Sequence, residues 1–186
     1  MNKNLLLLLV SIVFATNHAF SQIKFEKGHY ITNSGKKVEC LIKNLDWEHN
    51  PTKIQYKLNE LDSSKEKNIE EIKEFEITGV SKYIKNTTNI DTSSSKINSL
   101  SEQRNPVFES KTVFLKVIIS GKASLYKYSA PDLRRYFYSL NQGEITPLVY
   151  KKYLKAKPGS RGVYSNSMVA ENNMFRQQLK NNLKCS

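Results

Sequence analysis

Basic and aromatic side chains alternate in three short segments in the second half of the chain. The interleaved residues are Tyr126, Lys127, Arg134, Arg135, Tyr136, Tyr138, Lys151 and Lys152. A cation beside an aromatic ring can bind anionic groups, and such rings stack on sugars or bases, so these residues are a candidate ligand surface. The alternative is structural, because tyrosine and phenylalanine in a strand often face the core while arginine and lysine alternate outward. The sequence leaves both interpretations open.

Other residue types that do chemistry occur without the necessary spacing. After the first 21 residues the histidines are His29 and His49, and Cys40 lies between them without a second ligand at metal-binding spacing. There is no G-x-S-x-G motif, and the two Gly-Lys pairs lack the other residues of a phosphate-binding loop. We therefore expect no catalytic residue, no metal and no cofactor. A hydrolase with opposed carboxylates remains a third-ranked function.

The two cysteines, Cys40 and Cys185, allow one disulfide in an exported chain. Such a bridge would close a very long loop and contribute about 4 to 5 kcal/mol in the chain-entropy model. In the alternative, Cys40 is a small buried residue of a strand, and Cys185 is a free thiol or pairs with a group outside this chain.

The first half of the chain has the pattern of short antiparallel strands. We predict a hairpin over residues 24–44, a strand over residues 53–58, a turn that leads into a strand over residues 69–78, and a strand over residues 82–91. Trp47 lies in the loop before Pro51, and we expect it to cover the core.

The second half combines a meander with a helix. We predict a flexible surface loop over residues 92–104, a three-stranded meander over residues 111–140, and a strand or helix start over residues 146–154. Residues 166–184 are predicted to form a helix, with Ser167 as its N-cap and Phe175, Leu179 and Leu183 on one face. The predicted fold is mainly β, a sandwich or open barrel of antiparallel hairpins with one C-terminal α-helix.

The first 21 residues have the pattern of a secretory signal peptide. Lys3 gives a positive start, residues 5–14 are apolar apart from Ser11, and the small residues Ala19 and Ser21 favour cleavage after Ser21. A helix of ten residues reaches about 15 Å, half of a bilayer core of about 30 Å, so this run is too short for an anchor. We expect residues 22–186 to form a single β-rich extracytoplasmic domain without a transmembrane helix.

The chain is strongly basic, with 29 Lys and Arg against 17 Asp and Glu. Loss of Lys3 with the signal peptide lowers the net charge from +12 to +11. An exported basic domain favours an anionic glycan or an anionic lipid as its partner, and export makes nucleic acid the least expected one. The lysines form no block of five like charges, so an ordinary solvated surface is the alternative.

Short motifs are spread along most of the chain after residue 21. They occupy residues 28–39, 46–47, 50–54 and 72–75, and further ones occupy residues 104–108, 148–154 and 172–183. The first four segments resemble the N-terminal domain of an uncharacterised family of exported Bacteroidetes proteins, and the last three are similar to a flavobacterial subset of it. Longer members resemble outer-membrane β-barrel proteins that carry this region as a periplasmic or surface domain. The resemblance implies association with the outer membrane, with this chain as a truncated or stand-alone version.

These observations rank three functions. The first is a non-enzymatic structural or interaction domain of the cell envelope, whose partner is an outer-membrane or periplasmic protein. The second is an extracytoplasmic binder of an anionic glycan or lipid, and the third is an unrecognised hydrolase. The expected location is the periplasm, the periphery of the outer membrane or the medium.

Overall fold

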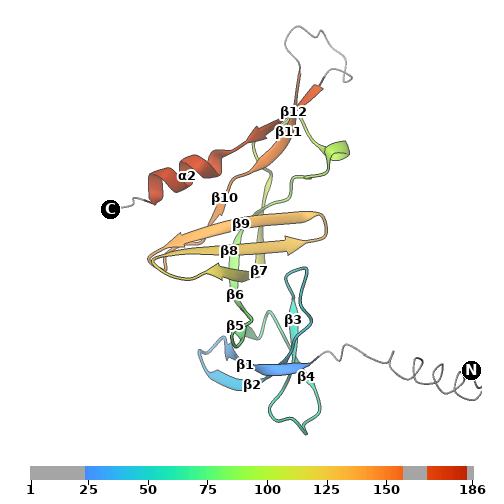
Figure 1. The fold of residues 1–186 in the computed structure, drawn as a ribbon, viewed down its shortest axis with the longest axis vertical. Helices are drawn as coiled ribbons and strands as arrows, with labels where there is room; N and C mark the ends of the chain where they lie inside the picture. The colour runs from blue at the N-terminus through green and yellow to red at the C-terminus, as the bar shows by residue number, and fades with distance from the viewer. Residues whose placement is uncertain (1–23, 157–166, 184–186) are drawn as a thin grey trace, which may run out of the picture.

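The computed structural model describes residues 24–156 and 167–183. These residues form one curled antiparallel sheet of ten strands, a separate two-stranded hairpin and one C-terminal α-helix (Figure 1). The structure confirms the mainly β fold class, and the large sheet curls into a half-barrel. The predicted signal peptide lies outside the described residues.

Most strands follow one another as hairpins. The strands are β1 (Phe25–Thr32), β2 (Lys37–Lys43), β3 (Lys53–Lys57), β4 (Lys65–Asn68), β5 (Ile72–Ile77), β6 (Ser81–Asp91), β7 (Phe108–Ile119), β8 (Ala123–Ala130), β9 (Leu133–Leu140), β10 (Thr146–Leu148), β11 (Lys151–Ala156) and β12 (Ser167–Asn172). A 3₁₀ turn, η1 (Ile97–Ser99), interrupts the β6–β7 connection, and the helix is α2 (Met174–Asn182). The large sheet has the order β10-β9-β8-β7-β6-β5-β1-β2-β3-β4, and β11 pairs with β12.

Glycine is required at two positions in the first hairpin. Gly35 lies in the β1–β2 turn at φ 89°, where a side chain would be strained. Gly28 of β1 faces Ile77 of β5, and a Cβ there would overlap the carbonyl oxygen of Glu76. The close approach of β1 and β5 therefore depends on the absence of a side chain at residue 28.

Two hydrophobic clusters lie on opposite faces of the same sheet. The first cluster consists of Tyr30, Cys40, Ile42, Ile54, Tyr56, Ile72, Phe75, Ile77, Tyr83 and Phe114. The second cluster consists of Ile90, Leu115, Tyr126 and Phe137. Since successive side chains of a strand point to opposite faces, the neighbours Phe114 and Leu115 of β7 enter different clusters. Burial on both faces explains why the centre of β7 is a continuous apolar run.

Trp47 covers the first cluster, as expected. Its ring lies 5.6 Å from that of Phe75 and 5.7 Å from that of Tyr83, both edge to face. Aromatic pairs favour this arrangement, which adds to the stabilisation from area burial.

Asn50, three residues further on, joins the loop to the other half of the sheet. Its Nδ2 donates to the carbonyl oxygens of Phe114 at 2.5 Å and Lys127 at 3.0 Å, and its Oδ1 accepts from the Ser129 N–H at 2.9 Å. The Asn50 N–H donates to the Ser129 carbonyl at 2.8 Å. Asn50 thus bridges β7 and β8 beyond the last residues that pair in these two strands, Lys116 and Lys127.

The C-terminal segment differs from the prediction. The first residues of the expected helix form β12, so Ser167 is a strand residue and Asn173 stands at the N-cap of α2. The pairing of β12 with β11 decides this, and the buried Asn172 strengthens it by donating to the Arg104 carbonyl at 3.1 Å. The helical spacing of the apolar residues begins only after Asn173.

Two further differences concern β4 and β10. Between the strands predicted over residues 53–58 and 69–78, the chain forms β4, a charged edge strand with the sequence KEKN. Charged side chains on an edge strand disfavour pairing with another chain. The strand expected over residues 146–154 is split into β10 and β11 at Val149, which is buried. Among the helices that the structure describes, none is long and apolar enough to span a membrane.

Candidate ligand-binding site

The alternation of β9 separates the basic and aromatic residues that the sequence brings together. Arg134 and Tyr136 are exposed on one face, whereas Arg135 and Phe137 are buried on the other. The expectation that the aromatics face the core and the cations face outward is therefore wrong for Arg135 and Tyr136. Phe137 enters the second cluster, and the two-residue period of a strand then carries Arg135 inward with it.

Arg135 is a structural residue rather than a ligand residue. Its Nε lies 3.1 Å from a carboxylate oxygen of the buried Asp91 and donates to the Asp91 carbonyl at 2.9 Å. Another guanidinium nitrogen donates to the Ser93 carbonyl at 2.5 Å. Burial lowers the pKa of Arg135, and the charge of Asp91 opposes that shift. These bonds hold the chain that follows β6.

Lys151 is also a structural residue, and it holds the other end of the β6–β7 connection. It is 3% exposed, and its Nζ donates to the Asn105 carbonyl at 2.8 Å. Burial lowers its pKa. Residues 92–104, predicted to be a flexible surface loop, are therefore held at both ends, and Leu100 within them is buried.

Two of the predicted tyrosines are also engaged within the protein. Tyr126 belongs to the second cluster, and its hydroxyl lies 3.1 Å from the Ser139 Oγ. The hydroxyl of Tyr138 accepts a hydrogen bond from Asn182 of α2 at 3.0 Å. Of the eight residues that the sequence singles out, Arg134, Tyr136, Lys127 and Lys152 retain side chains that are not committed in this way.

A groove forms where α2 lies beside β9 and the β11–β12 hairpin. We call it the basic groove. Among its lining residues are Arg134, Tyr136, Leu148, Lys152, Phe175 and Arg176, and its volume is about 880 Å³. Arg135 also lines it, through its buried side chain, as do Tyr150 and Glu171.

The position of α2 depends on Gln178, which pairs with the free edge of β10. Its Nε2 donates to the Pro147 carbonyl at 2.9 Å, and its Oε1 accepts from the Val149 N–H at 2.9 Å. The Phe175 N–H donates to the Val149 carbonyl at 2.9 Å. A side-chain amide thus takes the place of a neighbouring strand, and the helix covers an edge that would otherwise be open.

The charges of the basic groove are unbalanced. The described ion pairs include none made by Arg134, Lys152 or Arg176. Two of the groove's three carboxylates have partners. Glu171 accepts a hydrogen bond from the Tyr150 hydroxyl at 2.9 Å, and Asp132 pairs with Lys96 at 2.6 Å.

Lys127 extends this positive surface along β8. It faces Lys116 of β7 directly and lies on the same face as Arg134. Its pKa is lowered, first by burial and then by the charges of Lys116 and Arg134. Like charges on facing strands destabilise a sheet, so this row of cations has an energetic cost that an anion would relieve.

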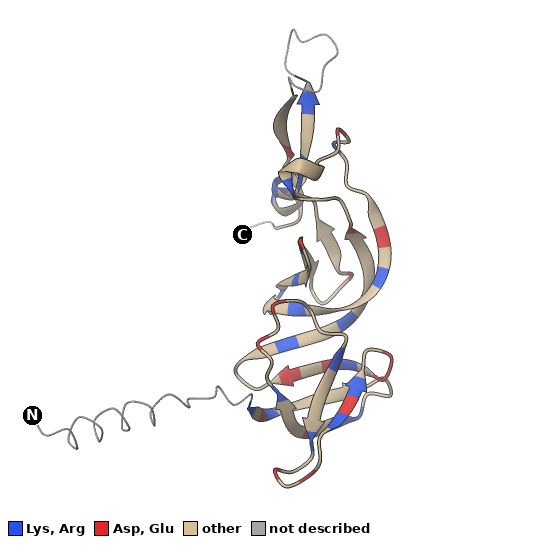
Figure 2. Ribbon diagram, turned by 90° about the vertical axis from the view of Figure 1, so that its right-hand side faces the viewer, with Lys and Arg blue, Asp and Glu red and all other residues tan. Residues whose placement is uncertain are grey.

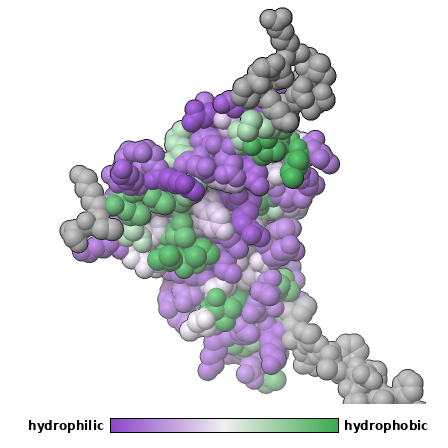
Figure 3. All heavy atoms as spheres, turned by 45° about the horizontal axis from the view of Figure 1, so that its top comes forward, coloured by the Kyte–Doolittle hydropathy of each residue, from purple (hydrophilic) through white to green (hydrophobic). Residues whose placement is uncertain are grey.

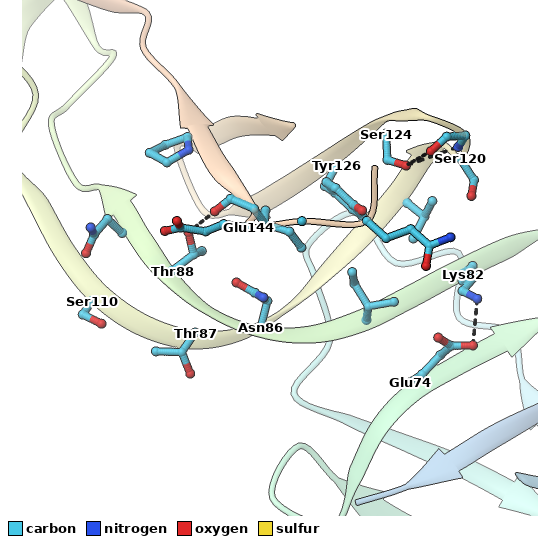
Figure 4. A pocket seen from close by; sticks show the side chains of 18 residues that line it. Glu74, Lys82, Asn86, Thr87, Thr88, Ser110, Ser120, Ser124, Tyr126 and Glu144 are labelled. Carbon is cyan, nitrogen blue, oxygen red and sulfur yellow. Dashed lines mark hydrogen bonds and ion pairs between the residues drawn. The ribbon is translucent and has the colours of Figure 1, made fainter. Parts of the chain in front are cut away.

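A second hollow lies between β6, the start of β8 and the loop before β10 (Figure 4). We call it the polar cleft. Its lining includes Asn86, Thr88, Ser124, Tyr126 and Glu144, and its volume is about 780 Å³. Its one ion pair among the described residues, Lys82 with Glu74 at 2.8 Å, lies at one end. Thr88 donates to the Ile145 carbonyl at 3.4 Å, the contact that brings β6 toward β10.

One group of potential metal ligands is assembled by the sheet and could not be found from spacing. Ligand atoms of His29, Glu74 and Glu76 lie within 4.8 Å of one another. Lys82 already supplies a cation to Glu74, and His29 Nε2 lies 3.8 Å from the same oxygen. We assign no metal site to this cluster, because an ammonium group occupies the position where an ion would bind the carboxylate.

Of the two cysteines, Cys40 is the one that the structure describes. It is a free, buried thiol of the first cluster, and burial raises its pKa to about 11. Cys185 lies outside the described residues, so the disulfide between Cys40 and Cys185 stays a prediction.

Comparison with known proteins gives no match: no protein-family model, curated protein or solved structure is significantly similar to this chain.

Proposed function

We propose that the protein is an exported, non-enzymatic interaction domain of the cell envelope, and that the basic groove is its binding surface for an acidic segment of another envelope protein. The observation that carries this proposal is the set of three groove cations, Arg134, Lys152 and Arg176, none of which forms an ion pair in the described part of the chain. Glu171 faces Lys152 across the β11–β12 hairpin and interacts with Lys152 and Arg176 without forming an ion pair with either. Leu148 and Phe175 give the same groove apolar surface, so an occupant with both acidic and apolar side chains suits it.

The distribution of charge along the chain supports an anionic partner. Residues 24–80 carry 10 Lys and Arg and 11 Asp and Glu, a net charge of −1. Residues 81–186 carry 18 Lys and Arg and 6 Asp and Glu, a net charge of +12. In the ribbon of Figure 2, most of the segments coloured as Asp and Glu lie at the end formed by β1–β5. The excess positive charge therefore belongs to the half that contains the groove, where it would attract an anion over a distance.

Export and envelope location rest on the N-terminal pattern and on the resemblance to exported Bacteroidetes proteins. Sequencing the N-terminus of the chain recovered from a Bacteroidetes host tests export, and Gln22 is the expected first residue. Cytoplasmic protein with an intact N-terminus would contradict the proposal.

Crosslinking tests the binding surface. A photoreactive residue in place of Tyr136, which is 40% exposed in the groove, should capture an envelope protein in living cells. The variant R134E/R176E should lose that product at least tenfold, because two attractions become repulsions. The variant K65E/K73E changes the net charge equally on the other half and should retain the product. Equal yields from both variants would show that the groove is not the binding surface.

An anionic glycan or lipid is the second candidate for the same groove. Tyr136 and Tyr150 are 40% and 41% exposed beside its cations, an arrangement that also suits a sugar ring or a lipid headgroup. Sedimentation with phosphatidylglycerol vesicles distinguishes the two candidates. Salt-sensitive binding that R134E/R176E abolishes would favour the lipid over the protein partner.

A further inference from the structure

Ser129 has an unusual side chain. It is 5% exposed, and its Oγ is the one buried side-chain polar atom in the described chain that has no hydrogen-bond partner. A buried hydroxyl without a partner has a free-energy cost, and such groups call for an explanation. Ser129 is also one of the residues that line the basic groove.

The backbone of Ser129 is fixed by Asn50, so the hydroxyl can change its position only by rotation about χ1. Its N–H and its carbonyl both bond to Asn50, at 2.9 and 2.8 Å. Residues 48 and 49, next to Asn50, line the groove as well. Asn50 therefore fixes the Ser129 backbone beside residues of the groove.

Two cations flank that hydroxyl on the same face of the sheet. Arg134 is the direct cross-strand partner of Ser129, and such partners have Cβ atoms about 4.5–5.5 Å apart. Lys127 lies two residues before Ser129 on β8 and so points to the same side. Lys116, opposite Lys127, adds a third positive charge.

We infer that Ser129, Arg134 and Lys127 form a subsite for a tetrahedral oxyanion, phosphate or sulfate, beside the basic groove. Ser129 and Arg134 line the groove, and Lys127 lies next to them on the same face of the sheet. The Ser129 hydroxyl is covered in this structure, and a rotation about χ1 would bring it to the anion. A tetrahedral anion presents enough oxygens to accept from the hydroxyl, the guanidinium and the ammonium. The anion would satisfy the Ser129 hydroxyl and offset the repulsion among the cations. The inference rests on the proposed binding role of the basic groove and adds to it a phosphate or sulfate group, which the occupant would carry in addition to the carboxylates of an acidic segment.

Glu48 gives the inference a discriminating control. Its carboxylate lines the same part of the groove and is not part of any described ion pair. A negative charge there opposes an incoming anion. Removing it should strengthen binding, whereas removing Ser129 or Arg134 should weaken it.

The test is a titration of the purified mature chain with inorganic phosphate, followed by the ¹H–¹⁵N NMR shifts of its backbone amides against sodium chloride of equal ionic strength. Saturable shifts should centre on residues 127–134. S129A should weaken the affinity about fivefold, R134A at least tenfold, and E48Q should strengthen it about threefold. S120A, at an exposed serine, should leave the affinity unchanged.

Stability separates binding from folding in this test. Because S129A removes a hydroxyl that has no partner, its urea midpoint should equal or exceed that of the wild type, so weaker binding cannot be attributed to unfolding. A soluble short-chain phosphatidic acid that binds more tightly than phosphate would assign the anion to a lipid headgroup. Equal affinities would assign it to a free phosphate or another phosphate ester.

Two results of this titration would contradict the proposed subsite. Shifts that do not saturate, or an S129A variant that binds phosphate like the wild type, would overturn the subsite. If the Tyr136 crosslink still depended on Arg134 and Arg176, the interaction function would stand without it. If that dependence also failed, the groove itself would lose its role.

Discussion

The two halves of the sheet are stabilised by different interactions. In the N-terminal half, β1–β5 pack mainly aromatic and aliphatic side chains into the first cluster, around the stacked rings of Phe75 and Tyr83 at 4.8 Å. The second cluster has four buried members, and polar groups surround it. The buried polar or charged side chains of the described chain all belong to this second half; they are Thr88, Asp91, Ser124, Ser129, Arg135, Ser139, Lys151 and Asn172.

This difference separates a scaffold from a binding region. The N-terminal half is neutral overall and pairs its charges locally, as in Lys53 with Glu66 at 2.9 Å. The C-terminal half carries the net positive charge and retains unpaired cations. Figure 3 also shows apolar surface beside α2 and beside the β11–β12 hairpin, where Met168 and Val169 are 46% and 44% exposed. Both the exposed apolar surface and the unpaired cations have a free-energy cost that a partner would reduce.

The largest expected effect is in the first cluster. Phe75→Ala removes a fully buried ring that contacts Trp47, Tyr83 and Phe114, and should lower the free energy of unfolding by about 3–5 kcal/mol. Urea unfolding measures it. Leu61→Ala, at a fully exposed leucine, should change stability by less than about 0.5 kcal/mol. A loss below about 1 kcal/mol for Phe75→Ala would contradict the role of this cluster.

The Arg135–Asp91 pair provides the corresponding test for the C-terminal half. Arg135→Met leaves a buried carboxylate without its cation and should cost about 3–5 kcal/mol. Replacing both residues, as D91L/R135M, should recover part of that loss, because no unpaired charge remains. A double-mutant cycle in urea measures the coupling. Additive losses would show that the pair acts through its separate bonds to the loop backbone.

Asn50, which joins the two halves of the sheet, provides the third test. Asn50→Ala removes three side-chain hydrogen bonds to β7 and β8 and should cost about 1–3 kcal/mol. It should also make the unfolding of the halves distinguishable, so that Trp47 fluorescence and far-UV circular dichroism no longer give coincident transitions. Asn98→Ala, at an exposed residue of η1, is the control and should preserve a single transition.

The smallest expected effect is a difference in pH dependence. Burial, with a contribution from Asp46, raises the pKa of Tyr83 from 10.0 to about 12. Between these values the folded state holds the proton that the unfolded state has released, so stability falls as pH rises through this range. Tyr83→Phe should reduce that fall, as followed by urea midpoints between about pH 9 and 11.

Lys151 should act with the opposite sign. Burial lowers its pKa, so near the ordinary lysine pKa the unfolded state binds more protons than the folded state. Stability therefore gains from this residue as pH rises toward that value, and Lys151→Met should remove the gain. Identical pH profiles for the wild type, Tyr83→Phe and Lys151→Met would contradict the assignment of these opposite contributions to Tyr83 and Lys151.

Much of the fold could be predicted from local patterns. The β1–β2 hairpin, the meander of β7, β8 and β9, and the covering position of Trp47 follow from alternation, turn residues and the size of the indole. The candidate site was predicted only in part. Arg134, Tyr136 and Lys152 line the groove, but Arg176, from the segment predicted as one long helix, was not identified.

The sequence alone determines that the side chains of β9 alternate between the two faces of the sheet, so that Arg134 and Arg135 must point to opposite faces. It does not determine which of the two is buried, because that depends on which neighbours cover each face. Only the tertiary structure places Asp91 and the loop carbonyls over Arg135, and leaves Arg134 beside Ser129 and α2. The period of a strand is a local property of the backbone, whereas the burial of a charge depends on partners that lie distant in the sequence.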